Sequence, residues 1–163
     1  MKTIIAILFT VCAIANAQIT SNDISAKHYT GEVTIQAAPQ AVFGMITNCE
    51  KHCALMGGKH ISGSTTYSKV GSTSYTEIDG GDKGTEVVTY FKPSKEIRIS
   101  FEPDNGTYLC GEKWVLTPSG NGTKVHYDET YTMSGPMDAN ALNHCTEMMN
   151  KGLNDLKTWC EKK

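Results

Sequence analysis

The hydrophobic residues of this chain follow two different periodicities, one typical of strands and the other of helices. Residues 29–38 alternate between apolar and polar side chains, which predicts a strand. Pro39 follows in the position where proline opens a helix. Apolar residues then recur every three or four positions as far as Met56, and Gly57-Gly58 end the pattern. This stretch predicts one amphipathic helix or a kinked pair of short helices.

The segment from residue 60 to residue 134 contains only strand and turn patterns. The clusters "GGDKG", "KPSK", "EPDNG" and "PSGNG" stand at hairpin spacing, with "KVG" a weaker break near residue 70. They predict six strands, at residues 60–68, 72–79, 84–92, 95–102, 107–117 and 123–134. Pro136 then begins a long helix whose apolar stripe runs to about Cys160. Strand, short helices, six antiparallel strands and a long helix together predict a single α+β domain.

The first residues have the features of a secretory signal. Lys2 precedes the apolar run "IIAILFTVCAIA", which is too short for a comfortable membrane span, and Ala15-Asn16-Ala17 matches the small-x-small cleavage pattern. We therefore expect a signal peptide at residues 1–17 and a secreted, extracellular protein whose single domain spans residues 18–163. An uncleaved membrane anchor is the alternative.

The charge balance gives little indication of a macromolecular partner. The 163 residues include 15 Lys and Arg against 17 Asp and Glu, a net charge of −2, with no basic stripe. We therefore expect no nucleic-acid partner. No later segment is apolar enough to cross a bilayer, so stable membrane insertion is not expected either. Nothing in the sequence implies a cofactor, and the oligomeric state stays open.

The cysteines and two asparagines fit an oxidising compartment. Of the six cysteines, Cys12 would leave with the signal peptide, and an odd number would remain: Cys49, Cys53, Cys110, Cys145 and Cys160. They allow at most two bridges and leave one thiol over. Asn105 and Asn121 each begin an N-x-T sequence in a predicted turn, and both are acceptors for N-glycosylation.

The sequence "CEKHC" at residues 49–53 suggests a metal site, but its details argue against one. Cys49 and Cys53 are one helical turn apart, and we expect His52 to point away from the face that they share. No second pair of ligands lies nearby in the sequence to complete a four-ligand set. No metal site is therefore expected.

Two glutamates occupy positions of the last hairpin where apolar residues are expected. Strand 123–134 places Glu129 on the same face as Val125, Tyr127 and Tyr131. If the turn at Gly120 pairs Leu116 with Val125, then Glu112 faces Glu129, Trp114 faces Tyr127 and Cys110 faces Tyr131. A slip of two residues would keep every face. Ile99 and Phe101 of the preceding strand join this face.

Two carboxylates in a partly dry environment should not both ionise easily, so one pKa should rise. Three interpretations of Glu112 and Glu129 follow. They are weak candidates for a catalytic acid and base, they contact the polar end of a ligand, or they face solvent near the strand ends. We favour a polar group of a pocket over a catalyst.

Three stretches carry a resemblance to a known superfamily. They are "VTIQAAPQAVFGMITN" (33–48), "WVLTPSGNGTKVHYDETY" (114–131) and "MMNKGLNDLKTWCEK" (148–162). In this order they resemble the START-like, or SRPBCC, superfamily of Bet v 1-type and polyketide cyclase/dehydratase-like proteins. The resemblance implies a helix-grip fold, in which a curved seven-stranded antiparallel sheet wraps around the C-terminal helix. It also implies a cavity for an apolar or amphipathic ligand between them.

The resemblance also implies which residues would line that cavity and which cysteines would meet. The implied ligand-binding residues are Ile99, Phe101, Trp114, Tyr127, Glu129, Tyr131, Leu142 and Met149. In a helix-grip arrangement the early helices support the end of the last helix, so Cys49 or Cys53 bridged to Cys160 is the first choice of disulfide. A bridge from Cys110 to Cys145 would need the cavity walls to converge, because sheet and helix axes normally lie too far apart.

From these features we expect a secreted protein that binds or carries a small hydrophobic or amphipathic molecule in its cavity. The alternative is a polyketide cyclase/dehydratase-like enzyme that uses a cavity carboxylate as acid or base, although no residue matches a catalytic signature. A third possibility is a defence or structural protein without a ligand, which a cavity filled by side chains would favour.

Overall fold

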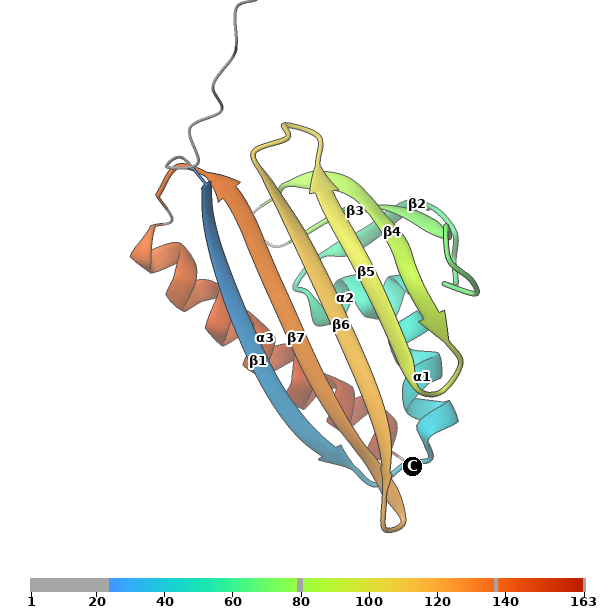
Figure 1. Ribbon diagram of the computed structural model, residues 1–163. Coiled ribbons are helices and arrows are strands. Elements are labelled where there is room, and N and C mark those ends of the chain that lie inside the picture. The colour runs from blue at the N-terminus through green and yellow to red at the C-terminus, as the bar shows by residue number, and fades with distance from the viewer. Residues whose placement is uncertain (1–23, 79–80, 137, 163) are drawn as a thin grey trace, which may run out of the picture.

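A single antiparallel sheet curves around three helices that all lie on its concave side (Figure 1). The computed structural model describes residues 24–78, 81–136 and 138–162; the predicted signal peptide lies outside these residues. The sheet has seven strands in the order β1-β7-β6-β5-β4-β3-β2. This arrangement confirms the predicted α+β helix-grip architecture.

The strands follow the predicted hairpins closely. They are β1 Ile24–Ile35, β2 Lys59–Gly63, β3 Thr73–Glu77, β4 Lys83–Lys92, β5 Glu96–Pro103, β6 Tyr108–Ser119 and β7 Gly122–Ser134. Several strand ends differ from the prediction, and β1 and β2 show the reasons. β1 begins five residues earlier, because Ile24 onward already pairs with the end of β7. β2 ends at Gly63, whose φ of +93° turns the chain out of the strand.

The helices begin and end where the local sequence favours it. The predicted helical stretch after β1 is two helices, α1 Pro39–Thr47 and α2 Cys49–Leu55. Asn48 separates them and caps α2, since its side-chain oxygen accepts a hydrogen bond from the Lys51 amide at 3.0 Å. The long helix is α3 Ala139–Glu161.

The start of α3 is a correction to the prediction that Pro136 opens the helix. Gly135 has a φ of +83°, so the chain is still turning before the proline. The helix begins after Asp138, whose carboxylate accepts a hydrogen bond from the Asn140 amide at 2.6 Å. An aspartate in this position satisfies one of the free amides at a helix N-terminus.

The core fills the space between the concave face of the sheet and the helices. Alternate residues of β5, β6 and β7 point into it, as the period-2 pattern predicts. Its buried members include Ile35, Val42, Ile46, Leu55, Ile97, Ile99, Trp114, Leu116, Val125, Tyr127, Leu153 and Leu156. No helix among the described residues has the length and apolar character needed to cross a membrane.

The last hairpin has the first of the two predicted registers. Leu116 pairs with Val125, Trp114 with Tyr127, Glu112 with Glu129 and Cys110 with Tyr131. The hairpin therefore places the two glutamates directly opposite each other on the concave face.

The predicted disulfide from Cys49 or Cys53 to Cys160 is wrong for this structure. All five cysteines within the described residues are free thiols, so the bridge from Cys110 to Cys145 is not formed either. Cys49 and Cys53 are fully buried on the side of α2 that faces the sheet. The opposite side of α2 faces the end of α3, where Lys51 lies 5.3 Å from the ring centroid of Trp159. The Cys53 sulfur instead lies 3.9 Å from Glu86 Oε2 on the sheet.

Helices α2 and α3 approach each other closely at a glycine of α3, Gly152. A Cβ at position 152 would lie 2.5 Å from the carbonyl oxygen of Leu55. We therefore expect Gly152→Ala to lower the free energy of unfolding by roughly 1–3 kcal/mol, although alanine is the better helix former. The urea midpoint of unfolding measures this change.

Gly44 in α1 provides the matched control. A Cβ there would meet no atom within 4 Å, so Gly44→Ala should raise the free energy of unfolding by about 0.5–1 kcal/mol. An equal gain in both variants would show that α2 and α3 do not pack as closely as described.

Candidate functional site

Three glutamates from neighbouring parts of the sheet point into the interior. Glu86 of β4, Glu112 of β6 and Glu129 of β7 are 1%, 5% and 1% exposed. Each occupies an inward position of its strand, where the neighbours on the same face are apolar or aromatic. Burying a carboxylate away from water is costly unless it is paired or hydrogen-bonded. The cluster therefore needs an explanation other than packing.

His52 of α2 completes the cluster from the helix side and is fully buried. Its Nε2 lies 3.4 Å from Glu112 Oε2 and 3.7 Å from Glu86 Oε1. The expectation that His52 points away from Cys49 and Cys53 is wrong, because all three side chains are buried together. Positions 49, 52 and 53 follow the i, i+3, i+4 spacing of one helix face.

The polar atoms of the cluster are only partly satisfied. Glu86 accepts hydrogen bonds from the Tyr67 hydroxyl and, at 3.9 Å, from the Cys53 thiol. Trp114 Nε1 donates to Glu112 Oε2 at 3.0 Å, and the Cys110 thiol donates to Glu129 Oε1 at 2.9 Å.

Three buried atoms of the cluster have no hydrogen-bond partner within the structure: Glu129 Oε2 and both ring nitrogens of His52. A buried polar atom left in this state costs about 1–3 kcal/mol.

The electrostatics of the cluster follow from burial and from the excess of negative groups. Desolvation, reinforced by the charge of Glu112, raises the pKa of Glu129 to about 7. Desolvation also raises the pKa of Glu86. Burial by itself lowers the pKa of His52, but the charges of Glu112 and Glu86 outweigh it and raise the pKa to about 9.

A cavity of about 10 Å³, the space of one water molecule, lies against the carboxylates. Its walls are Met56, Ile78, Glu86, Phe101, Cys110, Glu112, Glu129, Tyr131 and Met148. Of the residues predicted to bind a ligand, Phe101, Glu129 and Tyr131 line this cavity. Ile99, Trp114, Tyr127 and Met149 are instead packed into the hydrophobic core. The side chain of Leu142 lies outside the described residues.

Glu86 and His52 are the two members that the sequence interpretation missed. A signal existed for both. Glu86 is two residues from both Gly84 and Val88, so all three lie on the buried face of β4. The spacing of His52 from the buried cysteines places it on the same face of the helix as they are. Met148 lines the cavity, whereas its neighbour Met149, which was predicted to line it, packs into the core.

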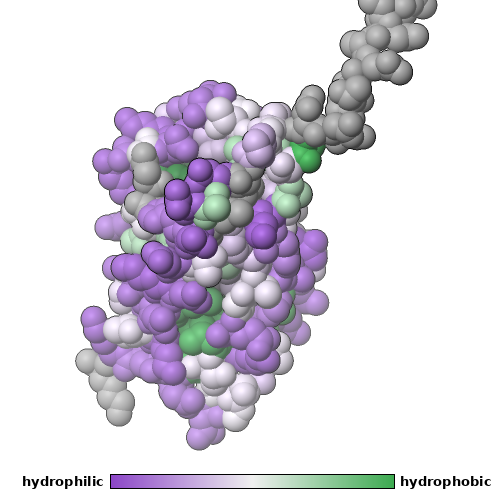
Figure 2. Space-filling model, turned by 90° about the vertical axis from the view of Figure 1, so that its left-hand side faces the viewer, coloured by the Kyte–Doolittle hydropathy of each residue, from purple (hydrophilic) through white to green (hydrophobic). Residues whose placement is uncertain are grey.

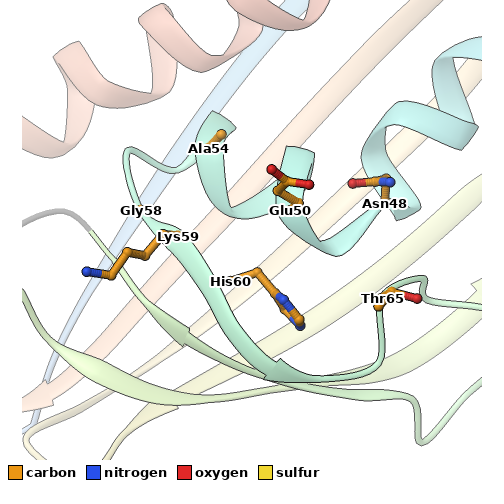
Figure 3. A pocket seen from close by; sticks show the side chains of 7 residues that line it. All are labelled: Asn48, Glu50, Ala54, Gly58, Lys59, His60 and Thr65. Carbon is orange, nitrogen blue, oxygen red and sulfur yellow. The ribbon is translucent and has the colours of Figure 1, made fainter.

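A second recess lies on the outside of α2 and is separate from the acidic cluster (Figure 3). It has a volume of about 370 Å³ and is lined by Asn48, Glu50, Ala54, Gly58, Lys59, His60 and Thr65. Both charge signs occur among these side chains. His60 projects from β2 into the space between α2 and Thr65. The recess offers no concentrated charge or apolar surface that would select a ligand.

Other predicted positions lie on the surface. Asn105 is exposed in the turn between β5 and β6, where its side-chain oxygen accepts a hydrogen bond from the Thr107 amide at 3.1 Å. Asn121 is exposed at the tip of the last hairpin. Both positions are accessible to a modifying enzyme.

The raised pKa values predict how stability depends on pH. A carboxyl whose pKa is higher in the folded state holds its proton more tightly when the protein is folded. The contribution of Glu129 to stability is therefore complete below about pH 4.5 and is lost as the pH rises through about 7. His52 has the same sign: its contribution is complete below 6.5 and lost as the pH rises through about 9. The free energy of unfolding should therefore fall from about pH 5 to pH 9.

Glu129→Gln should remove the loss of stability that the titration of Glu129 causes between about pH 4.5 and pH 7. We expect the stability of the variant to fall less steeply than that of the parent, since only Glu86 then contributes a raised carboxyl pKa, and to exceed the parent by on the order of 3 kcal/mol near pH 8. Glu102→Gln, on the exposed face of β5, is the matched control and should retain the parent profile. Urea denaturation across this pH range measures both, and identical profiles for all three proteins would contradict the proposed burial of charge.

Comparison with known proteins agrees with the geometry. No curated protein matches the chain. An uncharacterised protein from Rhizobium leguminosarum has a similar structure, with a TM-score of 0.64 at 16% identity, covering 86% of this chain and 99% of that one. Ara h 8.0201 gives 0.63 at 10%, covering 83% and 98%. The Aha1 dimer from Colwellia psychrerythraea gives 0.61 at 20%, covering 83% and 96%. These likenesses establish the fold.

The family assignment comes from the sequence. The family model described as "Polyketide cyclase / dehydrase and lipid transport" matches residues 26–161, which is nearly all of the described structure. This chain belongs to the polyketide cyclase/dehydrase and lipid transport family, within the START-like superfamily.

Proposed function

We propose that this protein binds a small amphipathic molecule between its sheet and α3, with the polar end of that molecule held by the buried carboxylates. Family and fold fit a ligand-binding or polyketide cyclase-like protein. The observation that carries the proposal is the unpartnered oxygen of Glu129 at the wall of an interior cavity. A ligand that donates a hydrogen bond to this oxygen would remove the cost of leaving it unpaired.

The chemistry of the cluster defines the polar end of the ligand. Carboxylates accept hydrogen bonds and repel anions. A hydroxyl or amine group is therefore favoured over a carboxylate group. The apolar part would lie against Phe101, Tyr131 and Met148, and burial of its surface supplies about 25 cal/mol per Å².

The cavity must enlarge to admit such a molecule, and the side of it formed by α3 is suited to this. Most of the described side chains of α3 before Met149 are exposed, whereas Gly152, Leu153 and Leu156 are buried. Within this first half, Cys145 lies against Tyr29 and Tyr131. Met56 and Met148 close the cavity, and methionine adapts readily to a new neighbour.

The described residues of the face shown in Figure 2 are mainly hydrophilic, with small hydrophobic patches between polar side chains. A large apolar patch would have indicated a docking surface on this face.

A second candidate function is an enzyme of the cyclase or dehydratase kind. One specific observation favours it: a carboxylate oxygen of Glu112 and one of Glu129 lie within 4.8 Å of each other and of the Cys110 sulfur. Paired carboxylates at this distance can pass a proton to and from a bound carbonyl compound. Recovery of a bound polyketone unchanged would favour the carrier, and its conversion, abolished in Glu129→Gln, would favour the enzyme.

The choice of head group provides the test of binding. We expect dodecylamine and dodecanol to bind at least about tenfold more tightly than dodecanoate, because a hydrogen bond to a charged group contributes roughly 1.5–3 kcal/mol. Glu129→Gln should weaken dodecylamine binding by a similar factor. Isothermal titration calorimetry at neutral pH measures these affinities.

Glu102→Gln again serves as the control and should bind dodecylamine as the parent does. Two results would count against the proposal: equal binding of dodecanoate and dodecylamine, or an affinity that does not change in Glu129→Gln.

We also propose that the protein is secreted, with cleavage after Ala17 and glycans on Asn105 and Asn121. The exposure of both asparagines supports the second part of this proposal. Expression of the full chain in eukaryotic cells should yield protein in the medium that begins at Gln18 and loses mass on treatment with an N-glycosidase. Retention of residues 1–17 on a cell-associated protein would contradict it.

A further inference from the structure

Three of the buried side chains converge from separate elements on one point in the interior. His52 comes from α2, Glu86 from β4 and Glu112 from β6. One atom of each, a ring nitrogen or a carboxylate oxygen, lies within 4.8 Å of the other two. Residues distant in sequence that meet in this way are held by the fold and not by a local turn.

The distances between these atoms match the edges of a small coordination polyhedron. Zn²⁺ binds imidazole nitrogen and carboxylate oxygen at about 2.0–2.1 Å, so two ligands of a tetrahedral site stand about 3.4 Å apart. His52 Nε2 is 3.4 Å from Glu112 Oε2 and 3.7 Å from Glu86 Oε1. Shifts of a few tenths of an ångström would bring all three atoms onto one ion.

An independent observation points to a missing partner for His52. The side chain is fully buried, and neither ring nitrogen has a hydrogen-bond partner within the structure. Nε2 nevertheless points at two carboxylate oxygens. An ion between them would displace the Nε2 proton to solvent and bind the lone pair that the proton leaves.

The surrounding side chains hold the two glutamates as a second layer around a metal would. Tyr67 and Cys53 donate to Oε2 of Glu86, which leaves Oε1 facing His52. Trp114 Nε1 donates to Glu112 Oε2 at 3.0 Å. Metal-binding carboxylates are commonly fixed in this way by outer hydrogen bonds.

The charge of the cluster also favours a cation. Three carboxylates and one imidazole share a buried region, and no lysine or arginine forms an ion pair with Glu86, Glu112 or Glu129 within the described residues. A divalent ion would balance two of the negative charges. The desolvation cost would then be offset by direct coordination bonds.

We propose that His52, Glu86 and Glu112 bind a divalent transition-metal ion, with Zn²⁺ the best match to the ligand types and distances. The remaining coordination position would be available to water or to a bound molecule. This site does not depend on the amphipathic ligand proposed above, since its three ligands are complete without it.

A second set of atoms competes for the same ion and must be distinguished by experiment. Cys110, Glu112 and Glu129 also present atoms within 4.8 Å of one another. The Cys110 thiol, however, already donates a hydrogen bond to Glu129 Oε1 at 2.9 Å. The set containing His52 is favoured because its nitrogen has no such partner.

Metal analysis of the secreted protein tests the proposal. The protein is stripped with a chelator, dialysed and supplied with Zn²⁺, and bound zinc is measured by elemental analysis. Competition with a chromophoric chelator gives the dissociation constant. We expect one ion per chain. His52→Gln and Glu86→Gln should each weaken binding by at least the roughly 100-fold seen for losses in the outer layer of metal sites.

Two control variants should bind Zn²⁺ as the parent does. Cys110→Ser alters only the competing set. His126→Gln alters a half-buried histidine near the surface whose nitrogens lie 3.1 Å from Asp128 and 3.2 Å from Glu32, and it reports uptake there. Protein loaded with Co²⁺ should lack the near-ultraviolet band of a cobalt–thiolate bond.

Several outcomes would overturn the proposal. These are no stoichiometric uptake, uptake that survives both His52→Gln and Glu86→Gln, or binding lost in Cys110→Ser together with a thiolate band in the parent. If His52→Gln fails to fold by circular dichroism, Glu86→Gln carries the test, because glutamine keeps the size of the side chain. Since only the metal is added, failure here is separate from failure of amphiphile binding.

Discussion

The repulsion and desolvation of three carboxylates in a dry interior is the constraint on which the rest of this structure depends. Glu86, Glu112 and Glu129 lie on the concave face of the sheet, where an antiparallel strand normally presents apolar residues. Substituting apolar side chains of similar size would remove the cost of burying charge. The proposed ligand or metal ion would offset this cost while the carboxylates stay in place.

The remainder of the core supplies the stability that tolerates this cluster. Trp114 packs on Tyr127 with ring centroids 4.2 Å apart, and α2 and α3 approach closely at Gly152. The second half of α3 belongs to this firm part of the molecule, whereas most of the described side chains of its first half are exposed. Met148 of α3 lines the cavity beside the acidic cluster.

Much of this organisation could be predicted from the sequence, because it rests on local patterns. The alternation in the last two strands was enough to place Glu112 opposite Glu129, since a short turn fixes the register. The lack of a disulfide among the described cysteines could not be predicted, because tertiary packing decides which side of α2 faces the sheet. Likewise, Glu86 belongs to the cluster only because sheet curvature brings β4 toward β6 across β5. The helical spacing of His52 places it on the buried face of α2, although it was predicted to point away from that face.

The most direct measurement of the central claim is a titration of the glutamate side-chain carboxyl carbons by NMR in the folded protein. Burial and mutual repulsion predict that the signal of Glu129, assigned through Glu129→Gln, titrates near pH 7. A set of glutamate signals that all titrate near the ordinary value of about 4.3 would contradict it. The carboxylates would then be solvated, and neither a ligand nor a metal ion would be needed to explain them.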